Sequence, residues 1–175
     1  MKKRYIVPLI ALLIIIFSIS VIACKATSLE QKPFDRSKIT SLSKDEEVRV
    51  GDIVWKVDNV EYLGSQIPGE FGDTLEATYG RFIGIEFGVE NIGQEVRTII
   101  DLKIIDSKGR EFPICAAAYG YLGTSEACLL VDVYPEAKQT FFASFDVPLD
   151  SVDLILEVSD LDSPSGEKAY IDLGI

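Results

Sequence analysis

The amino-acid sequence predicts an all-β protein, an antiparallel β-sandwich that follows an N-terminal export segment. From residue 47 onward, apolar and polar residues alternate with a period of two, as they do in half-buried strands. Stretches rich in Gly, Pro, Asn, Asp and Ser separate these segments roughly every dozen residues, and no stretch has a convincing helical period. A closed barrel is the alternative arrangement of the same strands.

The clearest strand is predicted at residues 81–91, RFIGIEFGVEN. The apolar residues of its expected core face are Ile83, Ile85, Phe87 and Val89. Gly84 and Gly88 share the opposite face and leave it bare, which indicates a bulge or a closely packed neighbour.

Other strands are predicted on both sides of this one. They cover residues 52–63, 96–106, 110–114, 139–148, 152–158 and 168–173. The alternation slips at Asp58-Asn59, where we expect an irregularity in the first of them. Ile100 and Val152 are expected on the core faces of their strands, because both are in register with the apolar residues that follow them.

The first residues predict export. Met1-Lys2-Lys3-Arg4 is basic, residues 6–23 are apolar or small apart from one proline, and no acidic residue precedes Glu30. This order is typical of a signal peptide, which we place at residues 1–23. The run is also long enough for a short transmembrane helix, so an uncleaved anchor and a plain secreted protein are alternatives.

The end of the apolar run resembles a bacterial lipobox. Val21-Ile22-Ala23-Cys24 has the aliphatic, small and cysteine positions of that motif. The resemblance implies that the chain is cut before Cys24 and that Cys24 carries a diacylglycerol, which would hold the protein at a membrane. The expected location is the extracytoplasmic face of the cell membrane.

Residues 24–46 contain few large apolar residues and are predicted to be a flexible tether, with the folded domain at 47–175. Loss of residues 1–23 removes three basic and no acidic residues, so the formal charge of −11 becomes −14. Such an acidic protein is a poor partner for nucleic acid or for anionic lipid headgroups, since both require clustered Lys and Arg. It is well suited to staying soluble at a crowded surface.

Several segments of the domain also resemble those of a known family. VRVGDIVWKVDNVEYL, RFIGIEFGVENIGQE, LKIIDSKGREF and QTFFASFDVP, within about residues 48–175, resemble a bacterial family of telokin-like, immunoglobulin-like domains of unknown function. The resemblance implies an immunoglobulin-like sandwich in a lipoprotein or secreted protein and supplies no catalytic residues. In that family a Pro-Gly turn precedes the F-D-V-P strand, whereas here Pro135-Glu136-Ala137 stands there.

If Cys24 is lipidated, Cys115 and Cys128 are the only cysteines left to pair. Export permits a disulfide between them. Closing a loop of about 14 residues would stabilise the domain by roughly 3 kcal/mol in the chain-entropy model. Two buried free thiols are the alternative, because free cysteine is a common core residue.

The sequence offers little for catalysis. It contains no histidine, which excludes the nucleophile systems that depend on a histidine base, and it has no phosphate-binding loop or zinc motif. We therefore expect no catalytic residue, no metal site and no cofactor. An enzyme that uses acidic residues alone is the remote alternative.

Two predicted loops are rich in aromatic residues. Residues 64–80 carry Phe71 and Tyr79, and residues 116–127 carry Tyr119 and Tyr121. Exposed aromatics on loops held by a rigid sandwich are a common means of binding partners. The alternative is that these rings fold back onto the core.

These observations predict a non-enzymatic, lipid-anchored binding or accessory module. Its partner is expected to be a protein or another component of the cell envelope. An envelope structural or stress-related lipoprotein without a specific ligand is the alternative.

Overall fold

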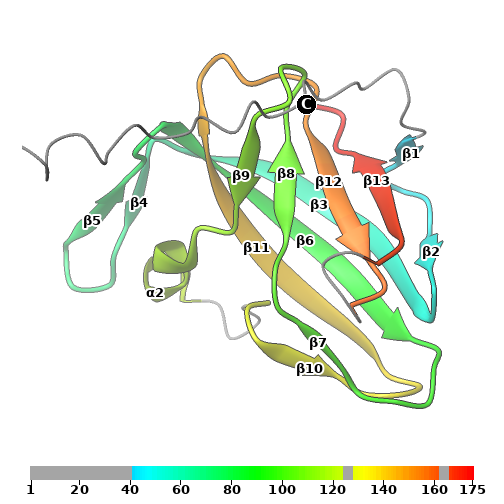
Figure 1. Cartoon of the computed structure of the whole chain (residues 1–175). Helices are drawn as coiled ribbons and strands as arrows, with labels where there is room; N and C mark the ends of the chain where they lie inside the picture. The colour runs from blue at the N-terminus through cyan, green and yellow to red at the C-terminus, as the bar shows by residue number, and fades with distance from the viewer. Residues whose placement is uncertain (1–40, 124–127, 162–165) are drawn as a thin grey trace, which may run out of the picture. The chain divides into compact units, whose positions relative to one another are not determined.

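The computed structural model describes residues 41–123, 128–161 and 166–175. In these residues the chain forms a β-sandwich of two larger sheets, accompanied by two two-stranded sheets, which confirms the predicted fold class (Figure 1). Residues 1–23, predicted to be a signal peptide, and Cys24 lie outside the described residues. Within the part of the chain that is described, no helix is long and apolar enough to cross a membrane.

The first sheet is built around one long central strand. Its order is β11 (Lys138–Pro148), β6 (Gly80–Asn91), β3 (Ile53–Gly64) and β2 (Val48–Val50). β6 pairs with β3 on one side and with β11 on the other, both antiparallel. The strands predicted at 52–63, 81–91 and 139–148 are therefore confirmed.

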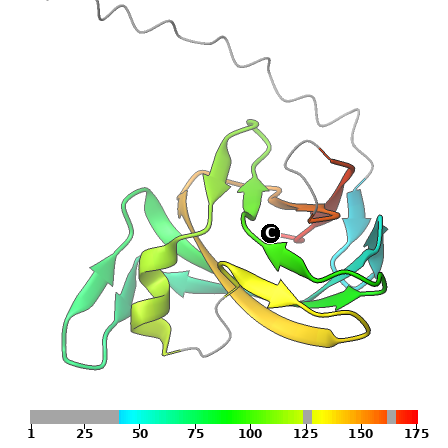
Figure 2. The same ribbon diagram turned by 60° about the horizontal axis from the view of Figure 1, so that its bottom comes forward.

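The second sheet faces the first (Figures 1 and 2). Its order is β1 (Ser41–Ser43), β13 (Lys168–Asp172), β12 (Ile155–Ser159), β8 (Lys103–Ile105) and β9 (Glu111–Pro113). β1 joins β13 in parallel and the other pairs are antiparallel. Because β1 lies inside the segment expected to be tether, the folded domain begins before the boundary expected at residue 47.

Two small sheets and a short helical segment complete the fold. The small sheets pair β4 (Gln66–Pro68) with β5 (Thr74–Glu76) and β7 (Arg97–Ile99) with β10 (Val131–Val133). The helical segment consists of a 3₁₀ turn, Ala116–Ala118, followed by α2 (Tyr119–Leu122). Both aromatic-rich regions expected to be loops thus contain regular structure.

The main core lies between the two larger sheets. The four apolar residues predicted to face it from β6 are each at most 1% exposed. Trp55 is buried beside Phe87, with ring centroids 5.8 Å apart, and its indole N–H donates a hydrogen bond of 2.8 Å to the carbonyl of Ser159. This hydrogen bond ties the first sheet to the second and satisfies the one polar atom of a buried tryptophan.

Close packing on the outer face of β6 explains the glycine at position 84. A Cβ on Gly84 would lie 2.7 Å from Cζ of Phe142, so the bare position is occupied by a ring from the neighbouring strand. On the other side, the register of β3 against β6 shifts between Val57 and Asn59. The predicted close neighbour and the predicted irregularity at Asp58-Asn59 are both confirmed.

Two expectations about local structure need correction, and one turn that the sequence left open is now defined. The segment 96–106 is not one strand, because β7 pairs with β10 and β8 pairs with β12, and Ile100 between them is 59% exposed. β12 begins at Ile155, which leaves Val152 exposed in the preceding turn. At the turn before β11, Glu136 has φ +59, so a non-glycine residue adopts the left-handed conformation that glycine adopts most easily.

A buried carboxylate holds one end of the sandwich together. Asp106 is 1% exposed and accepts hydrogen bonds from the backbone N–H of Lys108 and Arg110, from Arg110 Nε at 2.7 Å and from the Ser151 hydroxyl. These contacts connect the β8–β9 turn to the β11–β12 connection. Exposed Asp150 pairs with Arg110 and Lys108, and their hydrogen bonds lower its pKa to about 2.

We expect Asp106→Ala to lower the free energy of unfolding by about 2–3 kcal/mol, because it leaves two backbone N–H groups and Arg110 without their buried acceptor. Urea denaturation followed by circular dichroism measures this loss. Asp150→Ala is the matched control, since it removes the exposed partner of the same arginine, and its effect should be clearly smaller. Equal losses in the two variants would contradict a special role for the buried carboxylate.

Candidate interaction site

The β4–β5 hairpin projects from the sandwich and forms the candidate site (Figures 1 and 2). Its two strands pair from Gln66 with Glu76 to Pro68 with Thr74. The backbone N–H of Gly69 donates to the carbonyl of Asp73, and Gly72 in the turn has φ +84, a conformation that favours glycine. These features give the tip of the hairpin a defined backbone.

A small second hydrophobic cluster holds the hairpin on the sandwich. Ile67 of β4, Phe82 of β6 and Ala118 of the helical segment are buried together. Partly buried residues pack around them: Leu63, Leu75, Ala77, Cys115, Tyr121 and Leu122. The helical segment therefore packs against the base of the hairpin, where the sequence had suggested only a loop.

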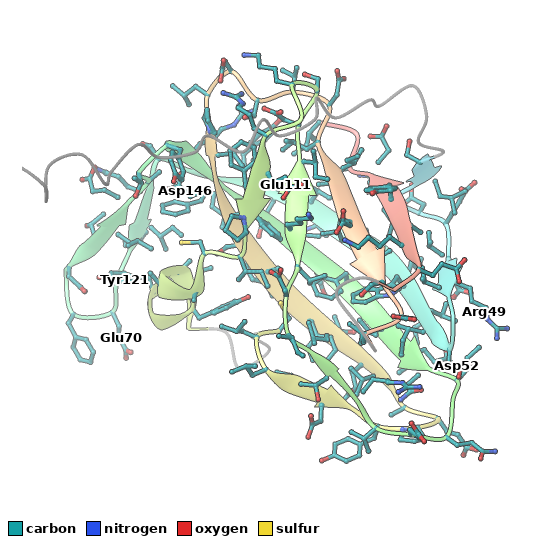
Figure 3. All side chains as sticks on the ribbon, in the orientation of Figure 1. Arg49, Asp52, Glu70, Glu111, Tyr121 and Asp146 are labelled. Atoms are coloured by element: carbon teal, nitrogen blue, oxygen red, sulfur yellow. The ribbon has the colours of Figure 1, made fainter. Side chains whose placement is uncertain are left out.

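Tyr121 braces the turn of the hairpin (Figure 3). The carboxylate of Asp73 acts on its hydroxyl and raises the pKa of Tyr121. A Cβ on Gly69 would lie 3.0 Å from Cδ1 of Tyr121 and would collide with Asp73, so the contact requires glycine there. Tyr121, proposed from the sequence as a binding residue, thus supports the hairpin.

Phe71 stands at the tip of this braced hairpin. Its side chain is 93% exposed, the highest value among the exposed large apolar residues of the described chain. Neighbouring Glu70 also lies at the tip (Figure 3). A large ring held in water by an ordered turn is accessible to a partner, and aromatic side chains are enriched in protein interfaces.

Tyr79 lies on a separate part of the surface. It is 62% exposed, and its ring centroid is 6.5 Å from that of Phe112. The carboxylate of Asp146, on the outer face of β11, accepts hydrogen bonds from the backbone N–H groups of Thr78 and Tyr79. Asp146 was not identified from the sequence, although its outward place in an alternating strand marked it as available for such a contact.

Tyr119 packs against the main core. Its hydroxyl lies 3.3 Å from Sγ of Cys128, and burial raises the pKa of this tyrosine far above its usual value. Of the four aromatic candidates, Phe71 and Tyr79 are therefore exposed on different elements, while Tyr119 is packed into the sandwich and Tyr121 braces the hairpin. The structure does not bring the four rings into one surface.

The predicted disulfide is absent. Cys115 and Cys128 are free thiols, and they belong to different clusters: Cys128 is buried in the main core, whereas Cys115 packs against the small cluster under the hairpin. Burial also raises the pKa of the Cys128 thiol. The described residues contain no group of three or more His, Cys, Asp or Glu side chains placed to hold a metal ion.

Comparison with known proteins gives similarity of fold. No protein-family model matches the sequence, and no curated protein matches it. Among solved structures, the yjhA protein of Bacillus subtilis has a TM-score of 0.55 at 14% identity, over 74% of this chain and 97% of that one. The secreted protein MPT63 of Mycobacterium tuberculosis has a TM-score of 0.55 at 14% identity, over 77% of this chain and 97% of that one.

A candidate lipoprotein of Bacillus subtilis, ycdA, has a TM-score of 0.52 at 12% identity. The match covers 75% of this chain and 39% of the longer ycdA chain. At these identities the three structures show a shared fold, the β-sandwich, which agrees with the architecture described above.

We expect the two free thiols to differ in their reaction with iodoacetamide. In the native Cys24→Ser protein, Cys128 should react at least about tenfold more slowly than in denaturant, because it is buried and its thiolate is disfavoured. Cys115 should react faster than Cys128. Peptide mass spectrometry measures both rates, and a denatured protein that reacts only after a reductant is added would contradict the free-thiol assignment.

Proposed function

We propose that this chain is a non-enzymatic binding module, held by a lipid on Cys24 at the extracytoplasmic face of a cell membrane. It recognises a protein or another envelope component through the β4–β5 hairpin. The observation that carries the proposal is Phe71, whose side chain is 93% exposed on a hairpin braced from below by Tyr121.

The energetics of Phe71 favour this role. Burying such a side chain is worth about 1.5–3 kcal/mol, and 1.4 kcal/mol corresponds to a tenfold change in affinity. Because the small cluster, which includes Tyr121, and the backbone hydrogen bond from Gly69 to Asp73 already fix the hairpin, binding loses little conformational entropy. A single aromatic anchor on a preorganised turn has the properties of an interface hot spot.

Sequence and fold support the rest of the proposal. The chain has no histidine, and the residues quoted above resemble the telokin-like, immunoglobulin-like family, to which we assign the domain. The basic and apolar segment ending at Cys24 supports export and lipidation. The secreted protein MPT63 and the candidate lipoprotein ycdA share the fold, which supports an extracytoplasmic location.

We expect Phe71→Ala to remove the specific partners of the protein in intact cells. Chemical crosslinking, affinity purification and quantitative mass spectrometry should recover them with the wild type and at least about tenfold less with the variant. Leu149→Ala is the matched control, because Leu149 is also largely exposed, at 69%, but lies in the β11–β12 connection. A partner set that Phe71→Ala leaves unchanged would favour the alternative, a lipoprotein without a specific ligand.

We expect labelled palmitate to enter the wild-type protein and not Cys24→Ser. The reason is that the thiol of Cys24 would form the thioether that precedes cleavage and further acylation. Autoradiography of the purified proteins measures incorporation, and membrane fractionation should show the variant released. Equal incorporation into both proteins would contradict lipidation at Cys24.

A further inference from the structure

A second apolar surface lies on the small sheet formed by β7 and β10, away from the β4–β5 hairpin (Figures 1 and 2). Ile99 and Val133 point inward and are fully buried. Between them on the outer side, the Thr98 hydroxyl donates a hydrogen bond of 2.7 Å to the Asp132 carboxylate. The outward side chains, which we call the β7–β10 face, are Val96, Thr98, Ile100, Leu130, Asp132 and Tyr134.

Four large apolar side chains of this face are exposed. Val96, Tyr134, Ile100 and Leu130 are between 48% and 69% exposed. The pairing of Thr98 with Asp132 places Val96 opposite Tyr134, and the backbone N–H of Leu130 donates to the carbonyl of Ile99 at the other end. The apolar residues thus lie at the two ends of one strand pair, four positions apart along each strand, with Thr98 and Asp132 between them.

Leu130 holds its exposed position in a strained conformation. Its φ is +57, a region that costs a non-glycine residue of order 1 kcal/mol or more. Because the side chain is 69% exposed, little packing within the domain offsets this cost. Strain of this kind in native structures is concentrated at ligand-binding positions.

A cavity of about 300 Å³ opens directly beside the face. β8 pairs with β12 only over Ile155 to Glu157. The residues that precede β8 turn away from β12 and, as β7, pair with β10, and the cavity forms at this divergence. Thr98 and Ile100 line both the cavity and the face, so the two are continuous. Leu102, Val158 and Leu161 supply the apolar part of its lining.

The charged groups of the cavity largely neutralise one another. Glu157 pairs with Lys168 at 2.7 Å and with Lys103 at 3.4 Å, and Lys103 also pairs with Glu111. Burial lowers the pKa of Lys103, but the two carboxylates outweigh this and raise it overall, so the amine stays charged. An apolar cavity of roughly 150 Å³ holds a benzene-sized group, so this cavity has room for one large apolar side chain.

The charge around the face selects the kind of partner. Asp132 lies in its centre, Asp101 and Glu95 adjoin its edges, and all three are exposed. The basic residue within the strand pair, Arg97, already lies 3.4 Å from Glu95. This acidic surface is repelled by anionic lipid headgroups and by a second copy of a chain with formal charge −11.

We infer that the β7–β10 face and the adjoining cavity form a binding site for an extended polypeptide segment of another protein. The segment has apolar residues four positions apart, one of which enters the cavity, and a Lys or Arg midway between them on the same side of the extended chain. The four-residue spacing matches the apolar side chains at the two ends of the face, and the basic residue midway faces Asp132, with Asp101 and Glu95 at the edges adding to the attraction. The site lies on different elements from the hairpin and goes beyond the function proposed above.

The test uses three fluorescent decapeptides and the full-length protein in phosphatidylcholine nanodiscs, with empty nanodiscs subtracted. The first peptide repeats Val-Ser-Lys-Ser, which places valine and lysine on the same side of an extended chain. The second replaces each lysine by glutamate, and the third has the composition of the first with its valines in one block. Fluorescence anisotropy should give an affinity for the first peptide at least tenfold higher than for the other two. Hydrogen exchange should slow at residues 98–102 and 157–161 when the first peptide is bound.

Leu130→Asn should weaken binding of the first peptide at least tenfold. Asparagine tolerates the left-handed conformation, so this variant should fold with an unchanged or higher melting temperature. Leu149→Asn, at an equally exposed leucine in the β11–β12 connection, should leave the affinity unchanged, as should Phe71→Ala on the hairpin.

Any of the following results would overturn the inference: equal binding of the valine-lysine and valine-glutamate peptides; equal loss in Leu130→Asn and Leu149→Asn; or loss in Phe71→Ala. If the wild-type protein dimerises and Leu130→Asn does not, the face is assigned to a second copy of the chain instead. If the wild-type protein floats with phosphatidylglycerol vesicles and Leu130→Asn does not, the face is assigned to a membrane. Failure of this test leaves the hairpin proposal intact, because that proposal depends on Phe71.

Discussion

The pairing of β6 on both of its sides is the constraint on which the rest of the domain depends. β3 and β11 both use β6 as their partner, so the whole first sheet is aligned by one strand. Four inward side chains of β6 lie in the main core, and burial of each is worth about 1.5–3 kcal/mol. Its outward face is equally constrained, because Gly84 leaves the space that the Phe142 ring fills.

This part of the fold could be predicted from the sequence because the strand is long and one of its faces is continuously apolar. The slip at Asp58 was also visible, since an extra residue in a strand reverses the alternation that follows it. The break within 96–106 could not be predicted. Ile99, Ile100, Ile104 and Ile105 are all apolar, and the pattern does not say which neighbouring strand each half pairs with, yet that choice exposes Ile100 and opens the cavity.

Only part of the candidate site could be predicted from the sequence. The composition indicated the two aromatic-rich segments, but the role of each ring depends on contacts that form only when the chain folds. Tyr121 contacts Asp73 and Tyr119 contacts Cys128, so one braces the hairpin and the other joins the main core. The predicted disulfide is not seen in the structure: Cys115 and Cys128 pack in different hydrophobic clusters, and sequence spacing carries no information about that placement.

The acidic charge of the chain connects the two proposed sites. Residues 64–80, which include the hairpin, carry three acidic and no basic residues, and the β7–β10 face is also bordered by carboxylates. An exposed Phe71 or Leu130 would promote self-association on a neutral surface. Like charge beside each apolar group opposes contact between copies, and it opposes contact with an anionic membrane as well. The same carboxylates favour a basic partner. The acidic charge would therefore both prevent self-association through the two apolar surfaces and favour basic partners at them.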